Sequence, residues 1–473
     1  MTRPLRWLAL LPILLAILLT TSRSFASGET LRVGLSGTYP PFSHFDEEGN
    51  LAGFDVDIAR ELCAKIGREC EFRVLPWDGI LSALLARKID VIVGSMAITE
   101  EREKQVLFTS PYYESGAQLF VRENAPAIGQ RGFRLGVTLG TTYGQIASSR
   151  FPEAEVRTYK GDVAILQDIQ SGRIDGMVTD RLVGLHMNER YGAGLVPHGE
   201  LLFTERMGIP VHPDERQLHA ELDHALRELR SSPAYPRIRA RYFGDERAGV
   251  AGGAGFSWRT SLTLLGRALL ATIEISVAGI SLGIALAVIL AALLLWAPAL
   301  VARPLAFYVD FIRSTPFLIQ LFTVYFGLPA IGVTLGAWTS AALVIAIHSS
   351  AYLAEVVKVA YQSIPAGQRH AANTLGLTRR EALVHVVWPQ MLPLLSAPSL
   401  NTLVATIKDS AIVSVISVHE LTMQAQQLIS TSFRPMEFYL LTALLYFAIT
   451  YPLLLLGRRM ERRFRAKGLL HAG

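Results

Sequence analysis

Five apolar segments in the second half of this chain constrain its fold more than any other feature. A helix needs about 20 predominantly apolar residues to cross the hydrocarbon layer of a membrane, and each segment approaches or exceeds that length. The sequence therefore predicts an all-α domain of five transmembrane helices over residues 261–467, which excludes a wholly soluble protein. The five segments lie at residues 268–294, 316–334, 337–357, 391–416 and 437–456.

Charge divides the chain near residue 256. Residues 257–473 contain 16 Lys and Arg and 8 Asp and Glu, whereas residues 1–256 carry a net charge of −3. Because the basic excess lies between apolar segments, it indicates membrane orientation and argues against a nucleic-acid partner. If the first half is exported, five crossings leave the C-terminus in the cytoplasm. Arg434 is then the only basic residue in the outer loops between the segments. The basic residues expected on the cytoplasmic side are Arg303, Arg313, Lys358, Arg369, Arg379, Arg380, Arg458, Arg459, Arg462, Arg463, Arg465 and Lys467.

The N-terminal residues have the pattern of a targeting segment. Arg3 and Arg6 precede an apolar run that is short for a membrane-spanning helix, and residues 24–26 (Ser-Phe-Ala) fit a signal-peptide cleavage site. We expect a signal peptide over residues 1–26, with an uncleaved anchor as the alternative. Both interpretations predict that the following domain is exported.

The region from residue 31 to residue 244 alternates between strand-like and helix-like patterns. Residues 89–95 read as a strand, for example, and residues 54–67 have helical apolar spacing. Alternating strands and helices indicate βαβ units and a mostly parallel sheet. Two such series predict an α/β domain of two lobes, a clamshell whose cleft can close on a ligand.

The lobes are expected to be joined by two extended segments, residues 117–122 and 207–212. This assignment puts lobe 1 at about residues 31–118 and 212–244, and lobe 2 at about residues 119–211. A stretch rich in Gly and Ala, residues 245–260, follows and predicts a flexible linker to the membrane domain.

Two cysteines, Cys63 and Cys70, are the only ones in the chain. In an oxidising compartment they can form a disulfide. On one unbroken helix they would be about 10.5 Å apart, which is too far for a bond. Gly67 lies between them, however, and is a natural residue to end a helix, so that the chain could turn back. Two free buried thiols remain the alternative.

Three features of the α/β region suggest a cleft for an amino acid. The guanidinium of Arg102 could clamp a carboxylate with two parallel hydrogen bonds, although the residue could also belong to a surface charge cluster. The sequence Gly-Thr-Thr at residues 140–142 follows a strand and opens a helix whose free amides could hold an anion. Asp180 ends a strand at the usual ligand edge of such a sheet. For residues 140–142 and Asp180, the alternative is an ordinary helix cap.

The first half resembles the periplasmic polar-amino-acid binding proteins, solute-binding family 3. The resemblance runs from about residue 31 to residue 244 and is carried by "LRVGLSGTYPPFSHFDEEGNLAGFDVDIARELC", "PWDGILSALLARKIDVIVGSMAITEEREKQVLFTSPYY" and "YPRIRARYFG". It implies that Cys63 and Cys70 form a disulfide. It also implies a set of ligand contacts: Tyr39 and Trp77 flanking the ligand side chain, Ser95 binding the α-ammonium or the α-carboxylate, Arg102 and Thr142 binding the α-carboxylate, and Asp180 binding the α-ammonium.

Two residues depart from the pattern of the basic-amino-acid binders in this family. Ser36 stands where those proteins have an acid that faces a cationic side chain, and Ala97 replaces a serine that helps to hold the carboxylate. Because a buried guanidinium without a counter-charge is costly, Ser36 predicts that a neutral polar ligand such as glutamine binds at least as well as arginine.

The second half resembles the permeases of ATP-binding-cassette importers over about residues 260–465. Its longest inner loop, residues 363–390, is similar to their EAA loop, and the sequences "DFIRSTPFLIQLFTVYFGLP", "SSAYLAEVVKV" and "NTLVATIKDSAIVSVISVHEL" match the polar-amino-acid subfamily. The loop is expected to be a helix flanked by breakers that docks a partner. The residues that carry the match are Ala371, Ala372, Gly376 and Pro389, whereas His370 departs from it by replacing the glutamate that usually opens the motif.

These observations predict a fused binding protein and permease that imports a polar amino acid, a transporter subunit and not an enzyme. No G-x-x-x-x-G-K-[ST] motif occurs in the chain, so we expect no cofactor here, no metal site, and ATP on a separate ATPase dimer. A permease of five helices should pair with a second copy or a close relative, and we expect a homodimer surrounded by lipid. The rival functions are a receptor or sensor that uses the same clamshell, and a periplasmic enzyme on that fold.

Overall fold

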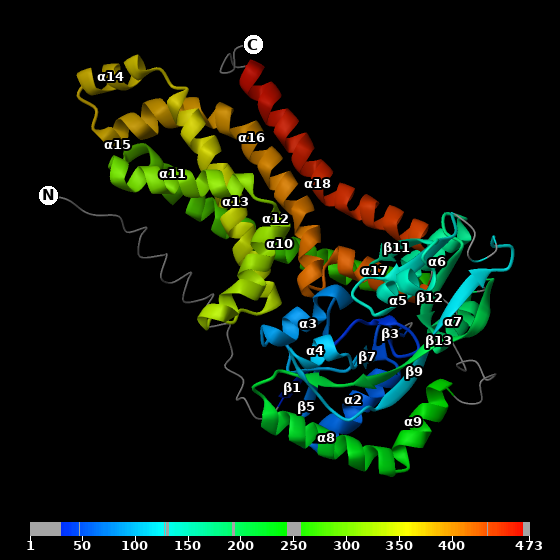
Figure 1. The fold of residues 1–473 in the computed structure, drawn as a ribbon. Helices are drawn as coiled ribbons and strands as arrows, with labels where there is room; N and C mark the ends of the chain where they lie inside the picture. The colour runs from blue at the N-terminus through cyan, green and yellow to red at the C-terminus, as the bar shows by residue number, and fades with distance from the viewer. Residues whose placement is uncertain are drawn as a thin grey trace. The chain divides into compact units, whose positions relative to one another are not determined.

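The structure is a computed structural model of the chain (Figure 1), and it describes residues 30–243, except 47, 127, 129–131 and 192–193, and residues 257–466, except 433. The chain divides into two compact units, one formed mainly by residues before 252 and the other mainly by residues after it. The predicted signal peptide, most of the predicted linker and Lys467 lie outside the described residues.

The first lobe of the binding unit is built on a sheet of five strands in the order β5-β1-β6-β14-β8, in which β1 is parallel to both β5 and β6. The parallel central pairs confirm the predicted βαβ units. The strands are β1 (Thr30–Leu35), β5 (Glu69–Val74), β6 (Val91–Ile92), β8 (Leu107–Phe108) and β14 (Pro210–Val211), beside a small sheet of β2 (Thr38–Tyr39), β3 (Ser43–Phe45) and β4 (Leu51–Ala52). The helices are α2 (Phe54–Lys65), α3 (Trp77–Leu85), α4 (Glu100–Glu103), α8 (Arg216–Ser231) and α9 (Ala234–Phe243).

The second lobe contains a sheet of six strands in the order β11-β10-β12-β9-β13-β7. Two long antiparallel strands are β9, which contains the predicted crossing segment 117–122, and β13, which contains only residues 207–208 of the predicted segment 207–212; β14 contains residues 210–211 of that segment. The strands are β7 (Met96–Ala97), β9 (Tyr113–Arg122), β10 (Arg134–Thr138), β11 (Glu155–Tyr159), β12 (Gly176–Asp180) and β13 (Leu195–Gly208). The helices are α5 (Tyr143–Arg150), α6 (Asp162–Gln170) and α7 (Arg181–Tyr191).

Helix α8 shows how sequence spacing places these helices. Its buried residues recur every three or four positions, so they form one apolar face along the helix, and that face packs against α2. The opposite face is charged, and Arg68 in the turn after α2 reaches Glu221 on α8 at 2.9 Å. The buried residues are Leu218, Leu222, Ala225, Leu226 and Leu229.

The disulfide between Cys63 and Cys70 is present, with the two Cα atoms 5.8 Å apart. Helix α2 ends two residues before Gly67, whose φ of +69° is the left-handed conformation that glycine adopts most readily. The Gly67 and Arg68 amides donate to the carbonyls of Ala64 and Cys63, which is the Schellman arrangement of a helix end. The predicted break at Gly67 is therefore confirmed, and it is what returns Cys70 to Cys63.

Residues 257–466, apart from 433, contain four helical stretches long and apolar enough to cross a membrane, or up to five if a bent helix pair is counted as one span. The four stretches confirm the predicted first, third, fourth and fifth segments. They are α10 (Trp258–Trp296), α13 (Ala337–Gln362), residues 379–416, which include α16 (Trp388–Asp409), and α18 (Pro435–Ala466).

The predicted second segment, residues 316–334, belongs to a bent helix pair and is not one regular α-helix. That region forms α12 (Phe317–Phe322) and two irregular turns ending at Ile331, and it is bent by 111° from α11 (Ala299–Ser314). Pro316 separates the two helices, and proline favours an extended residue before it. The predicted linker is also too long, since α10 already begins at Trp258, capped by the hydroxyl of Ser257.

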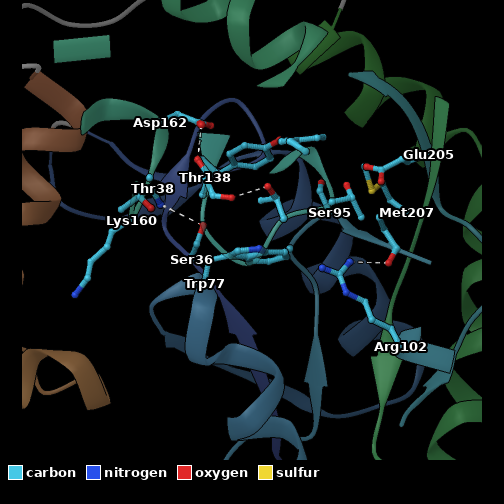
Figure 2. A pocket seen from close by; sticks show the side chains of 17 residues that line it. Ser36, Thr38, Trp77, Ser95, Arg102, Thr138, Lys160, Asp162, Glu205 and Met207 are labelled. Atoms are coloured by element: carbon cyan, nitrogen blue, oxygen red, sulfur yellow. Dashed lines mark hydrogen bonds between the residues drawn. The ribbon is translucent and has the colours of Figure 1, made fainter. Parts of the chain in front are cut away.

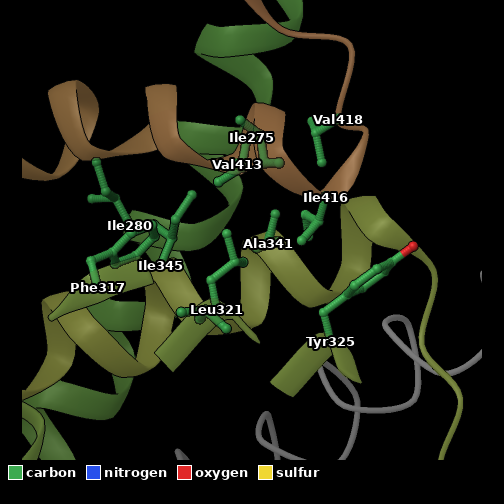
Figure 3. Packing of buried hydrophobic residues seen from close by; sticks show 12 residues of the cluster. Ile275, Ile280, Phe317, Leu321, Tyr325, Ala341, Ile345, Val413, Ile416 and Val418 are labelled. Atoms are coloured by element: carbon green, nitrogen blue, oxygen red, sulfur yellow. The ribbon is translucent and has the colours of Figure 1, made fainter. Parts of the chain in front are cut away.

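Helices α10 and α13 form the closest helix pair of the membrane unit. A buried cluster that includes Ile275 and Ile345 surrounds their contact, together with Leu321 and Val413 from neighbouring elements (Figure 3). A Cβ added at Gly279 would overlap Ile345 across the contact. Close helix packing through small residues is typical of membrane proteins.

We expect Gly279→Val to destabilise the membrane unit, because the added side chain must push Ile345 out of a packed contact. Overpacking of this kind costs about 1–3 kcal/mol. The measurement is the unfolding temperature of the purified chain in detergent. Gly266→Val is the matched control, since it lies on the same helix and its added Cβ would meet no atom within 4 Å. Equal melting of the two variants would show that the contact does not depend on the small residue.

Candidate functional site

A cavity lies in the binding unit and is lined by residues of both lobes. Small-molecule sites are typically concave and mostly apolar, with a few polar groups that orient the ligand. Five of the six residues predicted to contact a ligand line it: Tyr39, Trp77, Ser95, Arg102 and Thr142. Figure 2 shows Ser95, Arg102, Glu205 and Met207 at one end of the cavity, and Ser36, Thr38, Thr138, Lys160 and Asp162 at the other, with Trp77 between them.

Arg102 is held in place by the short helix α4. The hydroxyl of Thr99 caps this helix by accepting from the Arg102 amide, and the guanidinium donates to the carbonyls of Ala97 (2.8 Å) and Gly140 (3.0 Å). A guanidinium has five N–H donors, so three remain for a ligand. Burial lowers the pKa of Arg102 while Glu205 opposes the shift, but arginine keeps its charge in proteins. Ala97 thus contributes a carbonyl to the clamp instead of the serine hydroxyl of the family.

Thr142 precedes α5 at the cavity wall. Gly140 has a φ of +80°, which allows the tight turn between β10 and α5. The Thr142 hydroxyl makes no capping bond to the helix and instead hydrogen bonds to Glu205, where it lowers the pKa of that carboxyl. The first amides of α5 have no partner within the helix, so this end combines free N–H groups with the positive end of a helix dipole. The arrangement suits a carboxylate.

Asp180 is not among the residues that line the cavity. Its Oδ1 accepts from the amides of Leu182 (2.7 Å) and Val183 (3.4 Å), so it caps α7, the alternative that the sequence left open. It still acts on the cavity wall, because its charge raises the pKa values of Tyr39 and Tyr143. Burial raises the pKa of Asp180 itself to about 7.

Aromatic side chains form the middle of the cavity. The hydroxyls of Tyr39 and Tyr143 lie 3.4 Å apart across the two lobes. Burial is the main cause that raises the pKa values of both phenols well above their usual range, so both stay neutral. Gly94 and Gly140 approach the indole of Trp77, and a Cβ at either position would contact it. These rings provide flat apolar walls for a side chain of extended shape.

Two acids that the sequence analysis did not place in the cleft also line the cavity, Asp162 and Glu205. Asp162 starts α6 and accepts hydrogen bonds from Thr138 (2.6 Å) and Thr179 (3.3 Å), while burial raises its pKa to about 6. Burial also raises the pKa of Glu205, which lies on β13. A signal for Asp162 was present in the sequence, because it begins a helix that follows a strand, at the edge of the sheet where ligands usually bind. Glu205 gave no such signal, because its part of β13 was not predicted.

The EAA-like loop forms two short helices, α14 (Ala366–Thr374) and α15 (Arg379–Ala382), so the prediction of a single helix ending in breakers is corrected. Gly376 has a φ of +78°, and the Gly376 and Leu377 amides bond to the carbonyls of Asn373 and Ala372 in a Schellman end. Pro389 breaks nothing, since it lies in the first turn of α16.

The side chains of α14 divide between two faces. Ala372 is buried, whereas His370, Ala371 and Leu375 are exposed, with Leu375 at 81%. The side chain of Gln390 on α16 donates to Gln368, which ties α14 to the following helix. His370, Ala371 and Leu375 therefore form an exposed ridge, and the bond between Gln390 and Gln368 fixes the helix that carries it.

Known proteins match both units of the chain. Residues 31–245 match the model of bacterial extracellular solute-binding proteins, family 3, and residues 265–466 match that of the binding-protein-dependent transport system inner membrane component. The L-cystine-binding protein TcyJ of Escherichia coli is 33% identical over 46% of this chain and 84% of that protein. The L-arginine-binding protein of Pseudomonas aeruginosa is 34% identical over 48% and 93%. The histidine-binding periplasmic protein of Salmonella typhimurium is 31% identical over 49% and 95%.

A two-lobed domain with a ligand cavity, together with a unit of apolar helices, is typical of a membrane-bound protein that binds a solute. The chain belongs to the family 3 solute-binding proteins, fused here to a permease domain of the binding-protein-dependent transport systems. It is therefore a transporter subunit and not an enzyme, and it is a membrane protein with an extracellular binding domain.

Proposed function

We propose that this chain captures a polar amino acid outside the inner membrane and passes it inward as part of an ATP-binding-cassette importer. The proposal is supported most by the cavity, in which a guanidinium with three unused donors lies beside a helix N-terminus, at one end of an aromatic slot. The matched families and the relatives that bind cystine, arginine and histidine agree with it. In this proposal, Arg102 and the start of α5 hold the α-carboxylate.

The energy would come from an ATPase dimer that docks on the exposed ridge of α14. Neither unit contains a phosphate-binding loop motif, so the proposal needs this partner. Two permease copies would complete the membrane domain, with the C-terminus in the cytoplasm, as the basic residues favour. Co-purification of the full chain with its ATPase, and uptake by proteoliposomes that depends on ATP, test this part.

The position of Asp162 in the cavity wall supports a proposal for the class of ligand. Asp162 lies at the end opposite Arg102, where the ligand side chain would finish, and the side chain of Lys160 points away from the other labelled residues (Figure 2). Asp162 therefore supplies the negative charge that Ser36 lacks. We propose a ligand whose side chain ends in a cation or in hydrogen-bond donors, with arginine bound at least as well as glutamine. This replaces the expectation that rested on Ser36.

Asp162→Asn should lower the affinity for arginine relative to glutamine by about 10-fold, because a guanidinium loses its counter-charge while an amide does not. Calorimetric titration of the full chain in nanodiscs with both amino acids measures this ratio. The matched control is Asp168→Asn, on the same helix, whose carboxylate accepts from Tyr159 and is not part of the cavity wall. An unchanged ratio in Asp162→Asn would contradict the assignment of this end to the side chain.

A further inference from the structure

Asp55 lies directly behind a wall residue of the cavity, Ser95, without lining the cavity itself. Its side chain is fully buried in the first turn of α2. The Tyr112 hydroxyl donates to its Oδ1 at 2.6 Å, and the Ser95 hydroxyl donates to both carboxylate oxygens at 3.1 and 3.0 Å. The Ser95 amide donates in turn to the Tyr112 hydroxyl at 2.8 Å. Three residues thus form a closed buried network.

This network fixes the direction of the Ser95 hydroxyl hydrogen. A serine hydroxyl has one hydrogen to donate and two lone pairs to accept. A buried carboxylate is costly unless hydroxyl or amide groups donate to it, so Asp55 retains the hydrogen of Ser95. Toward the cavity, the hydroxyl oxygen of Ser95 can therefore act only as a hydrogen-bond acceptor.

The backbone of Ser95 is held in the same way. Its φ of +52° is in the left-handed region, which is uncommon for a residue other than glycine. Such a conformation persists only where the surroundings hold it, and here both the amide and the hydroxyl of Ser95 are bound. The oxygen of Ser95 is therefore presented to the cavity at a fixed place, at the same end as Arg102 (Figure 2).

We propose that Asp55 is a positioning residue that makes Ser95 an acceptor, so that Ser95 receives the α-ammonium group of the ligand and not its α-carboxylate. The inference rests on the proposed binding of an α-amino acid in this cavity. A carboxylate needs donors, which Arg102 and the start of α5 supply. An ammonium group has three donors and needs acceptors, which Ser95 supplies with the charge of Asp55 behind it.

The same geometry predicts a dependence on pH. Burial raises the pKa of Asp55 to about 7, and the two hydroxyl donors oppose that shift. A bound ammonium favours the ionised carboxylate, so binding releases a proton and affinity falls as the pH drops below about 7. Tyr112 faces Asp55 directly, and Tyr235 of α9 donates to the Tyr112 carbonyl. On α8, Arg230 bonds to the Pro111 carbonyl and Asp223 to the Ser110 amide, rather than to Asp55.

The test compares an amino acid with its analogue that lacks the α-amino group. The full chain in nanodiscs is titrated with L-arginine and 5-guanidinopentanoate, and with L-glutamine and 4-carbamoylbutanoate. The wild type should prefer each amino acid, and Asp55→Asn should reduce that preference by about 10-fold or more, as expected for a lost hydrogen bond to a charged group. The fall of affinity at acidic pH should also be smaller in the variant, because an amide at position 55 does not titrate.

Three further variants separate positioning from folding. Ser95→Ala should reduce the preference to a similar extent, and Asp55→Asn should cause no further loss in the Ser95→Ala background. Asp175→Asn is the control for a buried carboxylate, since Asp175 bonds to Arg122 and Arg134 away from the cavity wall, and it should keep the preference. Full preference in Ser95→Ala would overturn the inference alone. Failure of the wild type to bind either amino acid would overturn the proposed function, and this inference with it.

Discussion

Arg102→Ala is expected to weaken amino-acid binding by about 2–5 kcal/mol, the cost of removing one partner of a buried charge pair. In the proposed binding mode, the ligand carboxylate would keep only its contacts with the amides at the start of α5. The variant also loses the bond from Arg102 to the Gly140 carbonyl, which links the two lobes. Calorimetric titration of the full chain with arginine and glutamine gives the change in affinity.

Arg230→Ala is the matched control for this prediction. Arg230 also donates to a backbone carbonyl, that of Pro111, but it is exposed and lies outside the cavity wall. We expect this variant to bind as the wild type does. The affinity of Arg102→Lys should lie between those of Arg102→Ala and Arg230→Ala, because an ammonium group keeps the charge but lacks the fork geometry that matches a carboxylate. Wild-type affinity in Arg102→Ala would mean that the ligand is oriented by other groups.

The features that sequence reasoning predicted well are those set by local chemistry. The end of α2 at Gly67 follows from one glycine in the left-handed conformation, and the disulfide follows from that turn. Gly376 ends α14 by the same local chemistry, since its φ is also positive. Four of the five membrane segments are confirmed because hydropathy alone specifies a long apolar helix.

The features that it missed depend on tertiary packing. Glu205 lines the cavity from β13, an element distant in sequence from Arg102, and no local pattern places it there. The sequence marks Asp162 only as the start of α6, and tertiary packing brings it to the cavity wall. Asp180 was assigned to the ligand by resemblance, whereas the structure uses its carboxylate as the cap of α7. The bend between α11 and α12 was marked by Pro316, but proline alone does not specify an angle of 111°.

Gly376→Val is expected to abolish uptake while leaving ligand affinity intact. A Cβ at Gly376 would meet no atom within 4 Å, so the effect comes from the backbone and not from a clash. A β-branched residue is strained at a φ of +78°, and relief of that strain would break the Schellman end and turn α14 away from α15. The exposed residues His370, Ala371 and Leu375 would then no longer form the ridge on which we propose that the ATPase docks.

The measurements for this variant are ligand titration, ligand-stimulated ATP hydrolysis and uptake by proteoliposomes that contain the ATPase. Gly266→Val is the control, since Gly266 lies in α10, outside the proposed docking loop, its φ is not positive and its added Cβ would also meet nothing. It should keep all three activities, apart from the small cost of valine in a helix. Gly376→Val should lose hydrolysis and uptake together and keep its affinity. Loss of affinity would indicate misfolding of the whole chain, and normal uptake would show that energy enters the permease elsewhere than through α14.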